Sequence, residues 1–316
     1  MAVMRTARIG AARPQKTPLQ RGAKTIAMLA LAGVGKCGMT LLQRTDPWPV
    51  SRQAGRLMRA IGPRLRSDYV ARSNLRAAFP EKSPAEIDVI VNGVWNNVGR
   101  VLAEFGCLDR LWDYEPGQER GGRIVIENDS AQRLDALRAQ SRPALFFSAH
   151  TGNWEILPRA IEAFGFRLCT LYKSSGYAAT DDLIRKARGR SVEMIPASAG
   201  ALHRVRTALR AGSGLALHID QYDPSGIEVQ FFGRPCRTNP TLAWAARAFE
   251  YPLHAARVIR LPDERFKIEV TDALAAPRDG QGRVDIAGTM QMATGVLENW
   301  IREYPDQWLW VHRRWR

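Results

Sequence analysis

The sequence predicts an α/β protein whose mostly parallel or mixed sheet is covered by helices and preceded by a helical, membrane-associating region. Three observations lead to this prediction. From Arg123 onward, short apolar runs alternate with segments of helical periodicity, as in a sheet whose strands are joined by helices. Residues 50–110 read as helical throughout. Ahead of them lie a basic tail and an apolar stretch that approaches the ~20 residues needed to span a bilayer.

The elements of the α/β part follow one another in regular order. Each predicted strand is a short apolar run, and most are followed by a segment whose apolar residues recur at helical spacing. Open sheets of this kind place their sites at the carboxyl ends of the strands. The predicted strands cover residues 124–127, 144–149, 168–172, 192–196, 215–219, 252–260 and 266–271. The predicted helices cover residues 131–140, 154–164, 179–187, 201–210, 241–249 and 286–304.

The chain before this sheet divides into a basic tail, residues 1–24, and a helical region, residues 25–115, so that the α/β domain covers residues 116–316. The tail carries six basic residues and no acid. Residues 25–42 are apolar but interrupted by Lys36, and they read either as a membrane anchor or interfacial helix, or as a buried helix of the domain. A basic flank before an apolar segment keeps the amino terminus in the cytoplasm.

The following helices are rich in arginine. Basic side chains alternate there with Leu57, Met58, Ile61 and Leu65, a composition that suits a helix lying on anionic lipid. A solvated helical face is the alternative. The whole chain has a net charge of +15 and a pI near 10.3, which favours anionic partners such as a membrane, an acidic protein or nucleic acid. Its four cysteines are too far apart for a zinc site or a disulfide framework and indicate a reducing compartment.

The stretch from Arg142 to Pro158 carries the first chemical pattern. A buried strand ends at His150, Thr-Gly-Asn153 forms a turn, and Glu155 lies in the first turn of the next helix. In this arrangement the glutamate carboxylate can accept a hydrogen bond from one imidazole nitrogen and leave the other as a base. The glycine lets a substrate approach the backbone, and nearby N–H groups can stabilise an oxyanion. A structural histidine is the alternative.

A second strand also ends in polar residues, Asp220 and Gln221. These residues can orient a substrate, or Asp220 can pair with Arg188, which follows a predicted helix. The chain has neither the Gly-x-Ser-x-Gly elbow of serine esterases nor the His-Glu-x-x-His helix of zinc peptidases.

Four ordered blocks resemble the late acyltransferases of bacterial lipid A biosynthesis, the lauroyl and myristoyl type, within the lysophospholipid acyltransferase superfamily. The resemblance covers about residues 50–316. The blocks are Asn74-Leu-Arg-Ala-Ala-Phe-Pro80, Ser-Ala-His150-Thr-Gly-Asn-Trp-Glu155, Ile219-Asp-Gln221 with Phe231-Phe-Gly-Arg-Pro235, and Glu298-Asn-Trp-Ile-Arg-Glu-Tyr-Pro-Asp-Gln-Trp308-Leu-Trp-Val-His-Arg-Arg-Trp.

The resemblance implies that an acyl chain moves from acyl carrier protein to a hydroxyacyl group of a lipid A precursor, at the cytoplasmic face of the inner membrane. His150 would be the base and Glu155 its orienter, with no metal or cofactor. The implied supporting residues are Arg188, Asp220, Gln221, Asn153 and Lys173. Where the family usually has Tyr-Arg-Pro, this chain has Tyr172-Lys173-Ser174, and lysine does not replace a bidentate arginine.

Three other functions remain open from the sequence. A related acyltransferase would use a lysophospholipid or another glycolipid as acceptor, although the tryptophan-rich carboxyl-terminal block disfavours it. A hydrolase would direct the same pair of residues at water. A nucleic-acid-binding protein would explain the charge, but no recognised module is present, so we expect no nucleic-acid partner.

Overall fold

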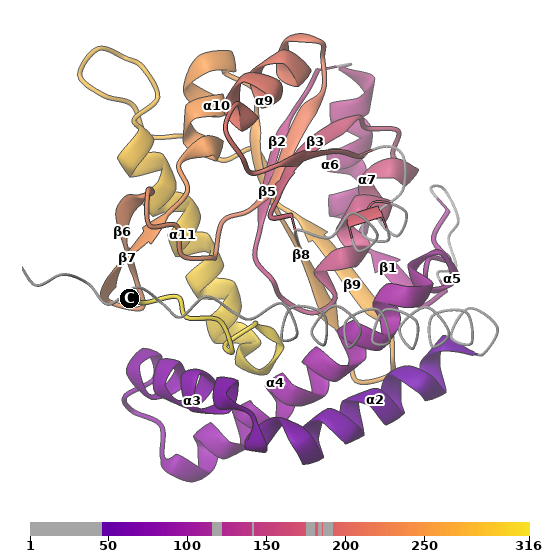
Figure 1. The fold of residues 1–316 in the computed structure, drawn as a ribbon. Coiled ribbons are helices and arrows are strands. Elements are labelled where there is room, and N and C mark those ends of the chain that lie inside the picture. The colour runs from indigo at the N-terminus through magenta and orange to yellow at the C-terminus, as the bar shows by residue number, and fades with distance from the viewer. Residues whose placement is uncertain (1–45, 116–121, 141, 175–180, 183–184, 186–191) are drawn as a thin grey trace, which may run out of the picture. The chain divides into compact units, whose positions relative to one another are not determined.

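The computed structural model describes residues 46–115, 122–140, 142–174, 181, 182, 185 and 192–316 (Figure 1). The predicted tail and anchor, residues 1–42, lie outside the described residues. The described chain starts with helices, and none of the helices in these ranges is both long and apolar enough to cross a bilayer. The helices before the sheet are α2 (Pro47–Ile61), α3 (Arg66–Ala78), α4 (Pro84–Glu104) and α5 (Leu108–Leu111), with single 3-10 turns at Gly62–Arg64 and Phe105–Cys107.

Local sequence signals set where these helices begin. Asp46 caps α2 by accepting the backbone N–H of Trp48, and α4 opens with a capping box between Ser83 and Glu86. Helices α2 and α4 pack closely because a glycine lies at their contact. A Cβ atom at Gly99 would lie 2.4 Å from the backbone oxygen of Ala54. This close contact fixes α4 against α2.

The main sheet has seven strands in the order β1-β9-β8-β2-β5-β3-β4. All neighbouring pairs are parallel except β8 with β9, so the sheet is mixed and mostly parallel, as predicted. The strands are β1 (Ile124–Ile126), β2 (Leu145–Ser148), β3 (Leu168–Tyr172), β4 (Val192–Pro196), β5 (Gly214–His218), β8 (Leu253–Arg260) and β9 (Phe266–Val270).

Helices cover the two faces of this sheet and create two apolar cores (Figure 1). The central strand β2 supplies both cores, because successive side chains point to opposite faces. Leu145 and Phe147 belong to the core with α9 (Ala201–Arg210), α10 (Thr241–Phe249) and α11 (Ile286–Glu303). Phe146 belongs to the core with α6 (Asn128–Ala139) and α7 (Leu157–Ala163). A strand buried on both sides explains its uninterrupted apolar sequence.

Two parts of the chain were not predicted as they occur. An antiparallel hairpin of β6 (Ile227–Phe231) and β7 (Arg234–Thr238) forms a separate two-stranded sheet. The predicted helix 154–164 starts as a 3-10 turn, η3 (Trp154–Ile156), before α7. After α11 the C-terminal segment, residues 305–316, passes next to the end of β2, where Thr151 forms an isolated bridge with Trp308.

Candidate active site

His150 and Asp220 are brought together by the pairing of two parallel strands. Each follows a strand end by two residues, His150 after β2 and Asp220 after β5, and the last residues of these strands, Ser148 and His218, pair in register. The imidazole Nδ1 of His150 lies 2.8 Å from Oδ1 of Asp220. The backbone N–H of His150 donates to Oδ2 of the same carboxylate, also at 2.8 Å. The pair therefore sits at the carboxyl edge of the sheet.

The Asp220 carboxylate is buried and accepts a third hydrogen bond, from the indole Nε1 of Trp308 at 2.7 Å. Burial alone would raise the pKa of Asp220, but the charge of His150 and the hydrogen bonds from it lower that pKa well below its ordinary value. An ionised carboxylate only accepts hydrogen bonds, so Nδ1 of His150 carries the ring proton. The lone pair is then on Nε2, which is the arrangement of a general base.

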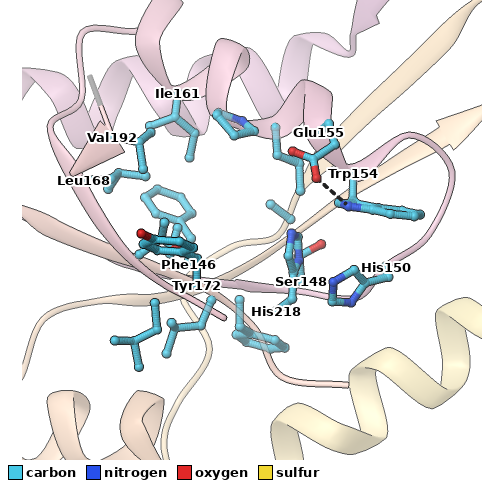
Figure 2. Close-up of a pocket in the computed structure, with 18 of the residues that line it drawn as sticks. Phe146, Ser148, His150, Trp154, Glu155, Ile161, Leu168, Tyr172, Val192 and His218 are labelled. Carbon is cyan, nitrogen blue, oxygen red and sulfur yellow. Dashed lines mark hydrogen bonds between the residues drawn. The ribbon is translucent and has the colours of Figure 1, made fainter. Parts of the chain in front are cut away.

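Glu155 contacts the imidazole through another residue. It is buried in η3, and its Oε1 accepts a hydrogen bond from the indole Nε1 of Trp154 at 3.0 Å (Figure 2). The Trp154 ring packs edge-on against His150, with ring centroids 5.1 Å apart. The carboxylate that faces Nδ1 of His150 is thus that of Asp220, whereas the sequence pointed to Glu155. Parallel strand pairing brings a residue 70 positions away to the ring.

Asn153 joins the turn after His150 to a buried ion pair. Its side-chain oxygen accepts the backbone N–H of Glu155 at 3.2 Å, and its Nδ2 donates to Oε2 of Glu104 at 2.7 Å. Glu104 is fully buried and pairs with both terminal nitrogens of Arg260, at 2.7 and 2.8 Å. Burial alone would raise the pKa of Glu104, but Arg260 lowers it. Both ends of the Asn153 amide are therefore bound to protein groups.

Gly152 is required by the shape of this turn. Its φ is +56°, and a Cβ atom there would lie 2.3 Å from the carbonyl oxygen of Val258. Its N–H donates to the carbonyl of Gln307 at 3.1 Å, while its own carbonyl accepts from Nδ2 of Asn97 at 2.9 Å. The backbone N–H and carbonyl of Gly152 are therefore both bonded to other groups of the protein.

The remaining predicted site residues divide into two groups. Nε2 of Gln221 lies 3.4 Å from Nε2 of His150, so its amide faces the ring nitrogen that carries the lone pair. Lys173 follows the end of β3 and lines the same cavity as His150. Arg188 lies outside the described residues.

The cavity beside His150 has a volume of about 280 Å³ and is lined by both polar and apolar side chains. Figure 2 shows His150, Trp154 and Glu155 on one side of it, with Leu168 and Val192 on the other. Its apolar walls come from strands β2, β3, β4, β5 and β8 and from helix α7. They consist of Phe146, Phe147, Leu157, Pro158, Ile161, Leu168, Leu171, Val192, Ala216, Leu217 and Ala256.

Two residues of the site were not predicted from the sequence. His218 lines the cavity, and its ring centroid lies 4.6 Å from that of His150. Its position follows from the register of β5 with β2, which apolar runs do not specify. Trp308 donates to Asp220 across 88 residues of sequence, and no local pattern indicates such a contact.

This geometry suits proton transfer next to a largely apolar cavity. Nε2 of His150 can take a proton from a hydroxyl group, and Asp220 stabilises the imidazolium that forms. An apolar cavity next to the base suits a hydrocarbon chain better than a polar substrate.

Comparison with known proteins gives one family. A family model described as bacterial lipid A biosynthesis acyltransferase matches residues 26–316. No curated protein matches the chain.

Proposed function

The chain belongs to the bacterial lipid A biosynthesis acyltransferase family, and from that premise we propose that it transfers a fatty acyl chain from acyl carrier protein to a hydroxyacyl group of a lipid A precursor, with His150 as general base. One observation carries the assignment of the base. An imidazole whose Nδ1 is bonded to a buried carboxylate lines a largely apolar cavity.

The reaction proceeds in two steps. The acceptor hydroxyl oxygen attacks the thioester carbonyl carbon while its proton passes to Nε2 of His150. The tetrahedral intermediate then collapses, the carbon–sulfur bond breaks, and the thiolate takes the proton back from the imidazolium. A positioned general base of this kind contributes ~10²–10⁴-fold to the rate. The products are the ester and the free thiol of the carrier, and His150 returns to its initial tautomer.

Asp220 is the proposed orienter in place of Glu155. Its carboxylate holds the ring by Nδ1 and the backbone by the N–H of the same residue. Glu155 is proposed to act on the ring indirectly, by fixing Trp154 against it. Asn153 is proposed to support the turn, since its amide is bound to Glu104 and Glu155.

The other residues have proposed roles toward the substrates. Gln221 is placed to contact the attacking hydroxyl, because its amide is near Nε2 of His150. Lys173, at the cavity, and Arg188 are proposed to bind anionic groups of the acceptor or donor. The apolar part of the cavity is proposed to receive the acyl chain.

We further propose that the enzyme works at the cytoplasmic face of the inner membrane. The supporting surface lies on α2 and the turn after it, where Leu57, Ile61 and Leu65 are 60%, 41% and 44% exposed. Arg56 and Arg59 are exposed on the same helix, and no acidic residue occurs between positions 47 and 67. Each such arginine near an anionic surface contributes about 1 kcal/mol to membrane attraction, which salt weakens.

Residues 25–42 would add a salt-insensitive attachment. We expect the full chain to stay in the membrane fraction after a high-salt wash and to need detergent for release. A chain that starts at Thr45 should bind through its arginines and elute with salt. Complete salt release of the full chain would contradict the anchor.

The activity is tested with purified protein, an acyl carrier protein thioester and a lipid A precursor, with the acylated product followed by mass spectrometry. His150→Ala should lose ~10²-fold or more of the transfer rate, the minimum for a general base. His203→Ala is the matched control, because this exposed histidine is on α9, outside the cavity lining. Release of free fatty acid without an ester product would indicate a hydrolase. An unchanged transfer rate in His150→Ala would refute the assignment of His150 as the general base.

A further inference from the structure

We propose that Trp308 is a positioning residue for acyl transfer, whose indole N–H holds the Asp220 carboxylate in the orientation that meets His150. This inference rests on the proposed role of His150 as base. It assigns a chemical task to the tryptophan-rich C-terminal segment, residues 305–316.

The argument begins with the hydrogen bonds around the carboxylate. Oδ2 of Asp220 accepts two of them, from the backbone N–H of His150 at 2.8 Å and from Trp308 at 2.7 Å. Oδ1 is then directed at the imidazole Nδ1, also at 2.8 Å. Bonds to an ionised acceptor are about twice as strong as neutral ones. Rotation of the carboxylate would break all three, so the two donors at Oδ2 aim Oδ1 at the ring.

Trp308 is itself held on both sides. It is buried, and its ring meets those of Phe231 and Trp310 edge-on, with centroids 5.6 and 4.6 Å away. Its backbone lies in a bridge with Thr151. The next residue, Leu309, donates its N–H to the carbonyl of His150 at 3.1 Å.

The helices before the sheet hold the C-terminal segment from the other side. Nδ2 of Asn74, on α3, donates to the carbonyls of Trp310 and His312 at 3.0 and 2.9 Å. Nδ2 of Asn97, on α4, donates to the carbonyl of Gln307 at 3.1 Å. The indole donor therefore belongs to a segment that α3 and α4 also hold by hydrogen bonds.

Loss of this donor has a defined electrostatic consequence. The indole N–H points a partial positive charge at Asp220. Without it, the negative charge of the carboxylate is less compensated and attracts a protonated His150 more strongly. The other charged and titratable groups near the pair are His218 on β5, His312 and Arg314 on the C-terminal segment, and Glu155 and Lys173 at the cavity. None of these changes when Trp308 is replaced by an apolar ring, so the ring proton of His150 should be held more tightly.

The test compares Trp308→Phe with Trp310→Phe in the full-length protein. Both lose a buried indole N–H from the same segment, but Trp310 donates to the carbonyl of Pro305. Trp308→Phe should lower kcat about 10- to 100-fold, as expected for one hydrogen bond to a charged group. Its KM should be nearly unchanged, and the acid limb of its pH–rate profile should move to higher pH. Trp310→Phe should keep the wild-type midpoint and a kcat within about threefold of wild type.

A second measurement separates this inference from the proposed function. Histidine side-chain NMR, assigned with His150→Ala, should show a higher titration midpoint for His150 in Trp308→Phe, whatever reaction the enzyme catalyses. Replacing Trp308 by 3-benzothienylalanine, which keeps the bicyclic ring without the N–H, should give the same result if Phe perturbs folding. An unchanged kcat and midpoint in both Trp308 variants would overturn the inference. A wild-type protein without transfer activity would overturn the proposed function instead.

Discussion

Replacement of Asp220 by asparagine should reverse the tautomer of His150. The amide has one accepting oxygen and one donating nitrogen, whereas both donors at Oδ2, the His150 backbone and the Trp308 indole, require an acceptor. The amide oxygen should therefore take the Oδ2 position and its nitrogen should face Nδ1 of His150. That nitrogen can only donate, so Nδ1 must accept and the ring proton moves to Nε2.

The size of the effect follows from this reversal. With a proton on Nε2, His150 has no lone pair to offer the acceptor hydroxyl, and the general-base contribution of ~10²–10⁴-fold is lost. A carboxylate-to-amide change that produces the wrong tautomer in a serine-protease triad lowers kcat by about 10⁴. We expect Asp220→Asn to lower kcat about 10³- to 10⁴-fold, and raising the pH should not restore it, because a tautomer does not depend on pH.

The assay is single-turnover acyl transfer to the lipid A precursor, followed by mass spectrometry. Asp223→Asn is the matched control, because Asp223 is on the same loop and accepts its bonds from Ser225 and Asn239, away from His150. It should retain near wild-type turnover. Both variants should unfold at similar temperatures. Retention of more than a tenth of the wild-type kcat by Asp220→Asn would refute the tautomer argument.

Three further predictions test the Glu104–Arg260 ion pair, the contact between α2 and α4, and the cavity. Glu104→Gln leaves the buried guanidinium of Arg260 without its ion pair and should lower the free energy of unfolding, measured with urea, by about 3–5 kcal/mol. The folded-state pKa of Glu104 is lowered, so the stability that its charge contributes is lost as pH falls through that pKa. The difference in unfolding free energy between wild type and variant should therefore narrow in acid. Gly99→Ala should destabilise the protein by about 1–3 kcal/mol, because the new Cβ overlaps α2. Gly295→Ala on α11 should stabilise it slightly, because nothing lies within 4 Å of the new Cβ. Equal changes in stability for the two variants would contradict the close packing of α4 on α2. Ala216→Leu fills part of the cavity and should lower turnover of long acyl donors relative to short ones; an unchanged ratio would place the acyl chain elsewhere.

The order of strands and helices is readable from the sequence because burial on both faces leaves uninterrupted apolar runs. The predictions for residues 168–172, 192–196, 201–210 and 241–249 match the observed bounds. The β6–β7 hairpin was missed for a physical reason. It pairs only with itself, and β7 alternates buried with exposed residues and contains Pro235, so it lacks an apolar run.

The site was predictable only to the extent that its residues are close in sequence or end a strand. His150 was predicted because it follows the end of β2, and Asp220 because it follows the end of β5, at the same carboxyl edge of the sheet. Which carboxylate meets the imidazole depends on which strands are neighbours, and periodicity does not contain that information. Sequence proximity favoured Glu155, but strand pairing favours Asp220.

The contact between Trp308 and Asp220 also has a consequence for the order of events during protein synthesis. Trp308 leaves the ribosome 88 residues after Asp220, while domains tend to fold from the amino terminus as they emerge. A nascent chain can therefore pair β2 with β5 while the carboxylate still lacks its indole partner. The hydrogen bond from Trp308 to Asp220 therefore forms only after the last part of this domain has been translated.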